Sequence, residues 1–150
     1  MSKMGRGRAV ALTGAALLAL GGAVVARAQM AERNVWSGVY TEEQATRGKA
    51  AYAEHCAACH GATLSGIDVA PALAGATFIG NWNNTSAADL FDRIKSTMPL
   101  NDPGSLGGRT VSDIEAFIFQ SNGFPAGELA LPPNQMMMTN VKITARKPGG

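Results

Sequence analysis

The sequence predicts a single all-α domain. Three segments place apolar residues at helical spacing, and the loops between them are rich in Gly, Asn and Pro. The chain has 150 residues, a length that suits one domain, and it contains no internal repeats.

The first 28 residues have the pattern of a cleavable signal peptide. The pattern begins with three basic residues, Lys3, Arg6 and Arg8. Residues 9–26 are uncharged and mostly small or aliphatic, and Ala26-Arg27-Ala28 fits a cleavage site. We therefore expect a periplasmic protein that begins at Gln29, with residues 29–37 as an N-terminal extension. The alternative is an uncleaved segment that anchors the protein to the inner membrane, because 18 uncharged residues lie at the lower edge of what spans a bilayer.

Loss of these residues reverses the charge of the protein. The full chain carries +2, whereas residues 29–150 contain nine basic and eleven acidic side chains and carry −2. Residues 29–141 alone carry −5. This balance argues against nucleic acid or an anionic membrane surface as the main partner, and we expect a membrane partner only if the signal segment is retained.

A first helix is predicted from Thr41 to about His55. Thr41 and Gln44 have the spacing of a capping box, and one face carries Ala45, Gly48, Tyr52 and Cys56. A glycine inside a helix costs about 1 kcal/mol relative to alanine. Gly48 therefore suggests that another helix crosses this face at short distance.

The pentapeptide Cys56-Ala-Ala-Cys59-His60 follows this helix and contains the only two cysteines. Two thiols at this spacing, followed directly by histidine, are typical of covalent attachment of haem c, with His60 as an iron ligand. A zinc site needs four ligands, and His55 is the only other histidine. A redox CxxC would follow a strand in an α/β pattern, which is not present here. One motif predicts one haem.

Residues 66–84 read as a loop with little regular structure, which contains Pro71-Ala72-Leu73 and Trp82. A second helix is predicted from about Ser86 to Thr97, capped by Ser86 and Asp89 and ended by Pro99.

A third helix is predicted from about Thr110 to Asn122, with Gly123 as its stop. Its inner face comprises Val111, Ile114, Phe117, Ile118 and Ser121. Phe119 falls outside that face.

Met98 is the best candidate for the second iron ligand. It closes the second helix, is followed by Pro99 and a turn, and stands 38 residues beyond His60. Its alternative role is that of a core methionine. Met136, Met137 and Met138 follow two prolines in a polar segment that offers no scaffold for a ligand.

These residues resemble the class I cytochromes c, and more narrowly the small ones that accompany quinoprotein alcohol and sugar dehydrogenases. The resemblance covers about residues 38–128, and it is carried by the following motifs: RGKAAY and CAACHG, PALAG, STMPLNDPGSL, and QSNGFPAG. It implies a class I cytochrome c fold, in which Gly48 and Tyr52 pack against Phe117. It also implies that the Pro71 carbonyl accepts a hydrogen bond from the His60 ring, and we expect Tyr52, Leu73 and Trp82 in the haem environment.

The function expected from this resemblance is single-electron transfer rather than catalysis. The donor would be a quinoprotein dehydrogenase, and the acceptor a terminal oxidase or another cytochrome. Two alternatives remain open at this point: an electron-entry subunit of a larger dehydrogenase or oxidase, and a haem enzyme or gas-binding protein with a labile Met98.

The C-terminal residues 129–150 are expected to be extended or disordered, with a short strand or packed strip over 141–144 as the alternative.

Overall fold

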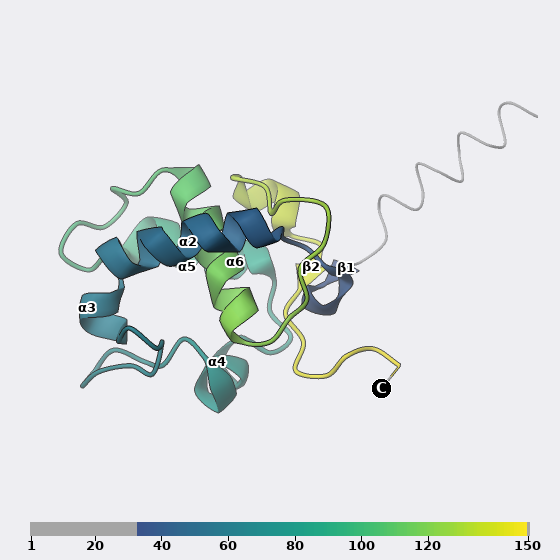
Figure 1. Ribbon diagram of the computed structural model, residues 1–150, viewed down its shortest axis with the longest axis horizontal. Coiled ribbons are helices and arrows are strands. Elements are labelled where there is room, and N and C mark those ends of the chain that lie inside the picture. The colour runs from purple at the N-terminus through teal and green to yellow at the C-terminus, as the bar shows by residue number, and fades with distance from the viewer. Residues whose placement is uncertain (1–32, 150) are drawn as a thin grey trace, which may run out of the picture. The chain divides into compact units, whose positions relative to one another are not determined.

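A computed structural model describes residues 33–149 of the chain. Five α-helices form the framework of this domain (Figure 1). They are α2 (Glu42–His55), α3 (Ala57–His60), α4 (Gly75–Trp82), α5 (Ala87–Thr97) and α6 (Gly108–Ser121). The helical fold class expected from the sequence is confirmed. The expected cleavage site and the segment before it lie outside the described residues.

The three predicted helices form close to the expected bounds. Thr41 caps α2 by accepting a hydrogen bond from the Gln44 N–H at 3.2 Å. Ser86 and Asp89 form a complete capping box at the start of α5. The third helix, α6, begins at Gly108, about two residues earlier than predicted, because Gly107 takes the N-cap position without a side-chain cap.

Helices α2 and α6 cross at Gly48, as the glycine predicted. A Cβ atom at this position would lie 1.7 Å from the Asp113 carbonyl oxygen and 3.0 Å from Phe117 Cβ. The Tyr52 and Phe117 rings pack beside the crossing, with centroids 5.3 Å apart. Arg47 adds a two-pronged ion pair to the Asp113 carboxylate, at 2.8 and 2.9 Å. The two helices are therefore joined by backbone, aromatic and ionic contacts at one point.

The prediction of a loop over residues 66–84 is wrong for its second half. Residues Gly75–Trp82 form α4, whose Phe78 is fully buried while Ile79 and Trp82 pack against the core. These three apolar residues at helical spacing stabilise the helix despite two glycines within it. Sequence analysis did not predict this helix because its two glycines have low helix propensity and because the N-cap residue provides no side-chain cap.

The C-terminal segment is packed against the domain, which corrects the expectation of an extended or disordered tail. Its buried side chains are Leu131, Met138, Val141 and Ile143. Strand β2 (Val141–Lys142) pairs in parallel with β1 (Arg33–Asn34), with Arg33 opposite Val141. The alternative of a short strand over 141–144 was therefore correct. The buried Val141 and Ile143 alternate there with the half-buried Lys142 and Thr144, and β2 pairs with β1.

The two ends of the described chain are held in place by two short 3-10 helices and by side-chain hydrogen bonds. The 3-10 helices are η1 (Val35–Ser37) and η2 (Gln135–Met138). The Gln44 amide donates to the Leu131 carbonyl at 2.9 Å and accepts from the Leu131 N–H at 2.7 Å. The Trp36 indole N–H donates to the Thr144 carbonyl at 2.9 Å.

This covering explains why α6 is buried on every side. Residues 111–119 are all buried, and Phe119, expected outside the inner face, is 0% exposed. It packs against Tyr40 and Phe124. Ser121, expected on the inner face, is exposed. A helical wheel assumes one buried face, and α6 has two because the terminal segments cover the second.

Candidate functional site

Helix α3 presents both cysteines of the Cys56-Ala-Ala-Cys59-His60 motif within a single turn. It follows α2 after a break at Cys56, whose N–H still bonds to the Tyr52 carbonyl at 2.9 Å. Cys59 is exposed and Cys56 is half-buried, and neither is in a disulfide. Burial, with a smaller effect of Cys59, raises the pKa of the Cys56 thiol to about 11. A redox-active CxxC needs a thiol with a lowered pKa, so this geometry disfavours the thiol-redox alternative.

His60 is held in one orientation by the loop opposite. Its Nδ1 lies 2.9 Å from the Pro71 carbonyl oxygen, which is the contact that the family resemblance implied. A carbonyl can only accept a hydrogen bond, so Nδ1 carries the proton and the Nε2 lone pair is free to bind a metal. The His60 side chain is largely buried, with 8% of its surface exposed. The ring is therefore a preoriented nitrogen ligand with Nε2 as its donor atom.

Two further hydrogen bonds fix the chain around His60. The Tyr52 hydroxyl donates to the Gly61 carbonyl at 2.8 Å. Burial, with a smaller effect of Cys56, raises the pKa of Tyr52 to about 12, so this hydroxyl remains a donor throughout the physiological range. Leu73 donates its N–H to the Leu64 carbonyl at 2.8 Å and closes the loop that carries Pro71.

Asn122 is a site-supporting residue that sequence analysis missed. Its side chain donates to the Leu73 carbonyl at 3.0 Å and accepts from the Gly75 N–H at 2.9 Å. The last turn of α6 therefore positions the segment that bonds to His60. The only signal in the sequence was an asparagine beside Gly123, which reads as an ordinary helix end.

Met98 occupies the C-cap of α5, and its N–H bonds to the Ile94 carbonyl at 3.0 Å. It is half-buried and packs against the core, as do Leu73, Trp82 and Cys56. The backbone of Met98 is therefore held by the end of α5.

The three tail methionines lie elsewhere. Met138 is 0% exposed, whereas Met136 and Met137 are 79% and 66% exposed. Figure 1 shows η2, the yellow-green helix that carries them, at the side of the domain away from α3. This separation disfavours all three as partners of His60 on one iron.

The donor set fits a covalently bound haem and does not fit a zinc ion. Within residues 33–149 no three His, Cys, Asp or Glu side chains are grouped to hold a metal. Cys56 and Cys59 would hold haem c through two thioether bonds, and the His60 nitrogen and the Met98 sulfur would be its iron ligands. When bound, haem c supplies one-electron iron chemistry. In the part of the chain that the structure describes, no helix has the length and apolar character required to cross a membrane.

One protein family and one solved structure match parts of this chain. Residues 43–118 match the family described as cytochrome c oxidase, cbb3-type, subunit III. A solved structure, the sulfane dehydrogenase SoxCD from Paracoccus pantotrophus, contains a chain with 23% identity and a TM-score of 0.43. That alignment covers 60% of this chain and 53% of the other, so this chain spans about half the length of that relative. No curated protein gives a significant match.

The family match includes α2, the cysteine motif, α5 and most of α6, and it covers half of the chain. Members of such a family are c-type cytochromes, which transfer electrons through haem and are not enzymes in their own right. The chain therefore belongs to the cbb3-type cytochrome c oxidase subunit III family of c-type cytochrome domains.

Proposed function

We propose that the protein is a periplasmic single-electron carrier with one haem c and with His60 and Met98 as the iron ligands. The observation that carries this proposal is the 2.9 Å contact between His60 Nδ1 and the Pro71 carbonyl, directly beside the only two cysteines. A histidine preoriented in this way is suited to permanent ligation. A thioether ligand raises the reduction potential relative to a second nitrogen.

The residues around the site are suited to electron transfer rather than to turnover. Met98 is fixed at the end of a helix that packs on the core, and His60 is fixed by Pro71. Ligands on rigid elements move little when the charge on the metal changes, which allows fast electron exchange. The donor that we infer from the resemblance is a quinoprotein dehydrogenase, and the acceptor is a terminal oxidase or another cytochrome.

A second candidate is an electron-entry subunit within a larger complex. It is favoured by the description of the matching family as a subunit of an oxidase. The two candidates share the same haem chemistry and differ in whether the partner is permanent. Size-exclusion chromatography of the native protein from its own cells distinguishes them, because a carrier elutes alone and a subunit elutes with its complex.

Substitution of Met98 tests the ligand assignment. Met98→Ala should abolish the near-infrared sulfur-to-iron band, lower the reduction potential and allow carbon monoxide to bind the reduced protein. The matched control replaces Met136 and Met137, which are exposed, and should change none of these properties. Loss of the band in the control, with retention in Met98→Ala, would move the ligand to the tail and refute the assignment.

A further inference from the structure

The basic side chains of the domain are concentrated at one end. Four of the nine in residues 33–149 lie on β1, on β2 or just beyond β2: Arg33, Lys142, Arg146 and Lys147. The parallel pairing of the two strands brings the first of these next to the others, although more than 100 residues separate them in the sequence. Within the described residues none of the four is in an ion pair. We call this group the basic end.

Few carboxylates accompany these charges. Asp89 is near enough to Lys142 for that lysine to contribute to lowering its pKa, although hydrogen bonds from Ser86 are the larger cause. Two other carboxylates are close to this end along the chain. Glu128 follows Gly127, which packs on Gly38 directly after η1, and Glu32 directly precedes Arg33 in the sequence. The remaining five basic side chains of residues 33–149 share the domain with eight other carboxylates. This end therefore carries more basic than acidic side chains, although residues 29–150 as a whole have a negative net charge.

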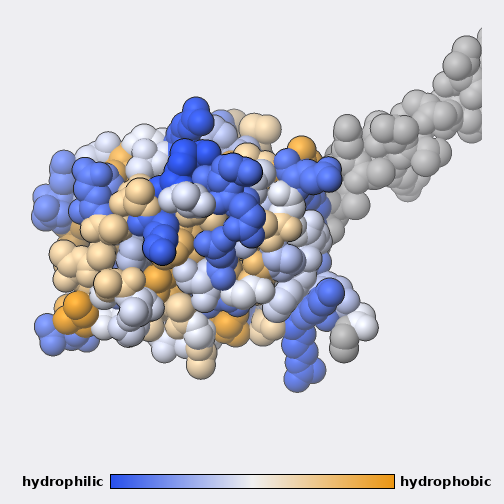
Figure 2. Space-filling model, viewed as in Figure 1, coloured by the Kyte–Doolittle hydropathy of each residue, from blue (hydrophilic) through white to orange (hydrophobic). Residues whose placement is uncertain are grey.

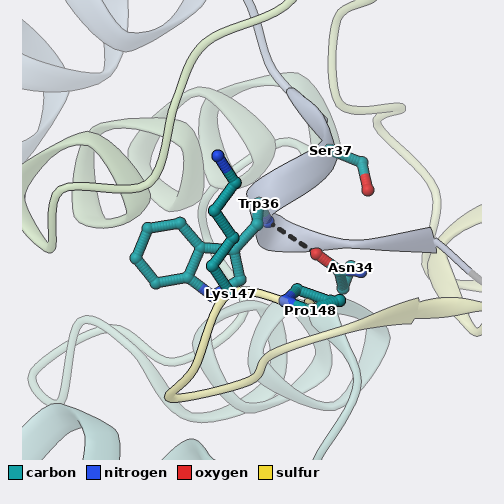
Figure 3. A pocket seen from close by; sticks show the side chains of 5 residues that line it. All are labelled: Asn34, Trp36, Ser37, Lys147 and Pro148. Atoms are coloured by element: carbon teal, nitrogen blue, oxygen red, sulfur yellow. Dashed lines mark hydrogen bonds between the residues drawn. The ribbon is translucent and has the colours of Figure 1, made fainter. Parts of the chain in front are cut away.

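Apolar groups accompany the charges. Trp36 lies half-buried beside Lys147 and Pro148, and with Asn34 and Ser37 they line a hollow of about 220 Å³ (Figure 3). Two exposed methionines, Met136 and Met137, precede β2 by a few residues. A tryptophan and flexible apolar side chains among cations are the composition that favours the interface between lipid headgroups and acyl chains.

The sequence links this end of the domain to the apolar segment 9–26. Six residues, 27–32, separate the end of that segment from Arg33, so an extended chain spans at most about 25 Å between residues 26 and 33. If the apolar segment lies in a bilayer, Arg33 cannot be farther than this distance from the segment's end at residue 26. The remainder of the domain is not tethered in this way.

We propose that the basic end binds anionic phospholipid headgroups. Cations near an anionic bilayer are attracted over about one Debye length, roughly 8 Å at physiological ionic strength. Figure 1 shows α3 at the opposite end of the domain from β1 and β2, and Figure 2 shows hydrophilic side chains along the side where the C-terminal segment projects. Lipid binding in this orientation turns Cys56, Cys59 and His60 away from the membrane, toward redox partners in the aqueous phase.

Lysine footprinting on the exported holoprotein tests this proposal. The protein is acetylated in the presence of phosphatidylcholine vesicles or of vesicles that also contain phosphatidylglycerol, and each lysine is quantified by mass spectrometry. If the signal segment is retained, the same two lipid compositions are used as nanodiscs. Lys142 and Lys147 should react about threefold more slowly in the anionic lipid, whereas the exposed Lys49 should react equally in both. Equal rates for Lys142 and Lys147 in the two lipids would overturn the proposal.

A pair of arginine substitutions supplies the second arm and leaves the lysine probes intact. Arg33→Gln with Arg146→Gln should remove most of the protection of Lys142 and Lys147. The matched control, Arg93→Gln with Arg109→Gln, removes the same charge from α5 and α6 and should leave the protection unchanged. Equal loss of protection in both pairs would show that net charge, and not this end, is responsible. Protection by an acidic redox protein but not by anionic lipid would assign the surface to a protein and refute lipid binding.

Discussion

Glu115 lies inside α6 with 0% of its surface exposed, and within the described residues neither of its carboxyl oxygens has a hydrogen-bond partner. Burial raises the pKa of Glu115 well above its usual value. A carboxylate in such a place would be unstable, so burial favours the protonated form in the folded protein, and we expect that form to persist toward neutral pH. In the unfolded chain the same group ionises above a pH of about 4.3.

This difference predicts the pH dependence of stability. Because the folded pKa is raised, ionisation of the unfolded state lowers the free energy of unfolding as the pH rises from about 4.3 toward the folded pKa, by up to about 1.4 kcal/mol per pH unit. Glu115→Gln should remove this slope and make the protein more stable than the wild type at pH 7. Urea unfolding of the holoprotein between pH 5 and 8 measures both effects.

Glu43→Gln is the matched control, because Glu43 lies exposed in the first turn of α2 and should retain the wild-type slope. A slope that persists in Glu115→Gln would mean that the buried carboxyl is ionised in the folded protein.

The crossing of α2 and α6 shows how closely two helices approach when one contributes no side chain. The Asp113 carbonyl lies against the Gly48 backbone while the Asp113 carboxylate binds Arg47. One residue of α6 therefore fixes both the separation of the two helices and their relative rotation. The Tyr52 ring, which supports the chain around His60, packs on Phe117 in the next turn of α6.

Even the smallest side chain at this crossing should be destabilising. Gly48→Ala gains about 1 kcal/mol of helix propensity, but its Cβ meets a backbone carbonyl that moves only with the whole of α6. We expect a net loss of about 1–3 kcal/mol in the free energy of unfolding, measured by chemical denaturation.

Gly80 in α4 provides the control for this substitution, because a Cβ there meets no atom within 4 Å. Gly80→Ala should be neutral or stabilising by up to about 1 kcal/mol. If both alanine variants were stabilised equally, the two helices would not be in contact at Gly48.

Sequence patterns predicted the elements that satisfy local rules and missed those that depend on distant residues. The caps at Thr41 and Ser86 and the close helix crossing at Gly48 were predicted from local signals, and the structure confirms them. The assignment of Cys56 and Cys59 to haem attachment stays a prediction. Helix α4 and the second buried face of α6 depend on residues far along the chain. Asn122 supports the site through bonds to residues 47 and 49 positions away, which no spacing rule detects. The assignments of Met98, Leu73 and Trp82 to the haem environment stay predictions.

On the scale of the whole domain, the two ends of the described chain complete the core. Leu131, Met138, Val141 and Ile143 are each no more than 2% exposed, and the Gln44 side chain forms two hydrogen bonds to the backbone of Leu131. The segment after residue 128 is therefore part of the domain and not an appendage. We therefore expect that a unit ending at residue 128, the limit of the family resemblance, is too short to be stable.

Truncation tests whether the segment after residue 128 is part of the domain or an appendage to it. A chain that ends at Leu131 loses three fully buried apolar side chains, each worth about 1.5–3 kcal/mol, and should lose most of its stability. A chain that ends at Ala145 loses only exposed residues and keeps the bond from the Ala145 N–H to Asn83. It should unfold at nearly the wild-type temperature. Thermal denaturation of both holoproteins measures the difference, and equal melting temperatures would show that the segment contributes no stability.

The pairing of β1 with β2 also sets an order of events in time. Val141 lies 82 residues after Cys59, so β2 reaches the folding domain later than the cysteine motif whenever the chain is delivered N-terminus first. Until the two strands pair, we expect the Cys56 thiol to escape the burial that raises its pKa to about 11. The cysteine motif should therefore be most open to reaction during that interval, which ends when the last strand forms.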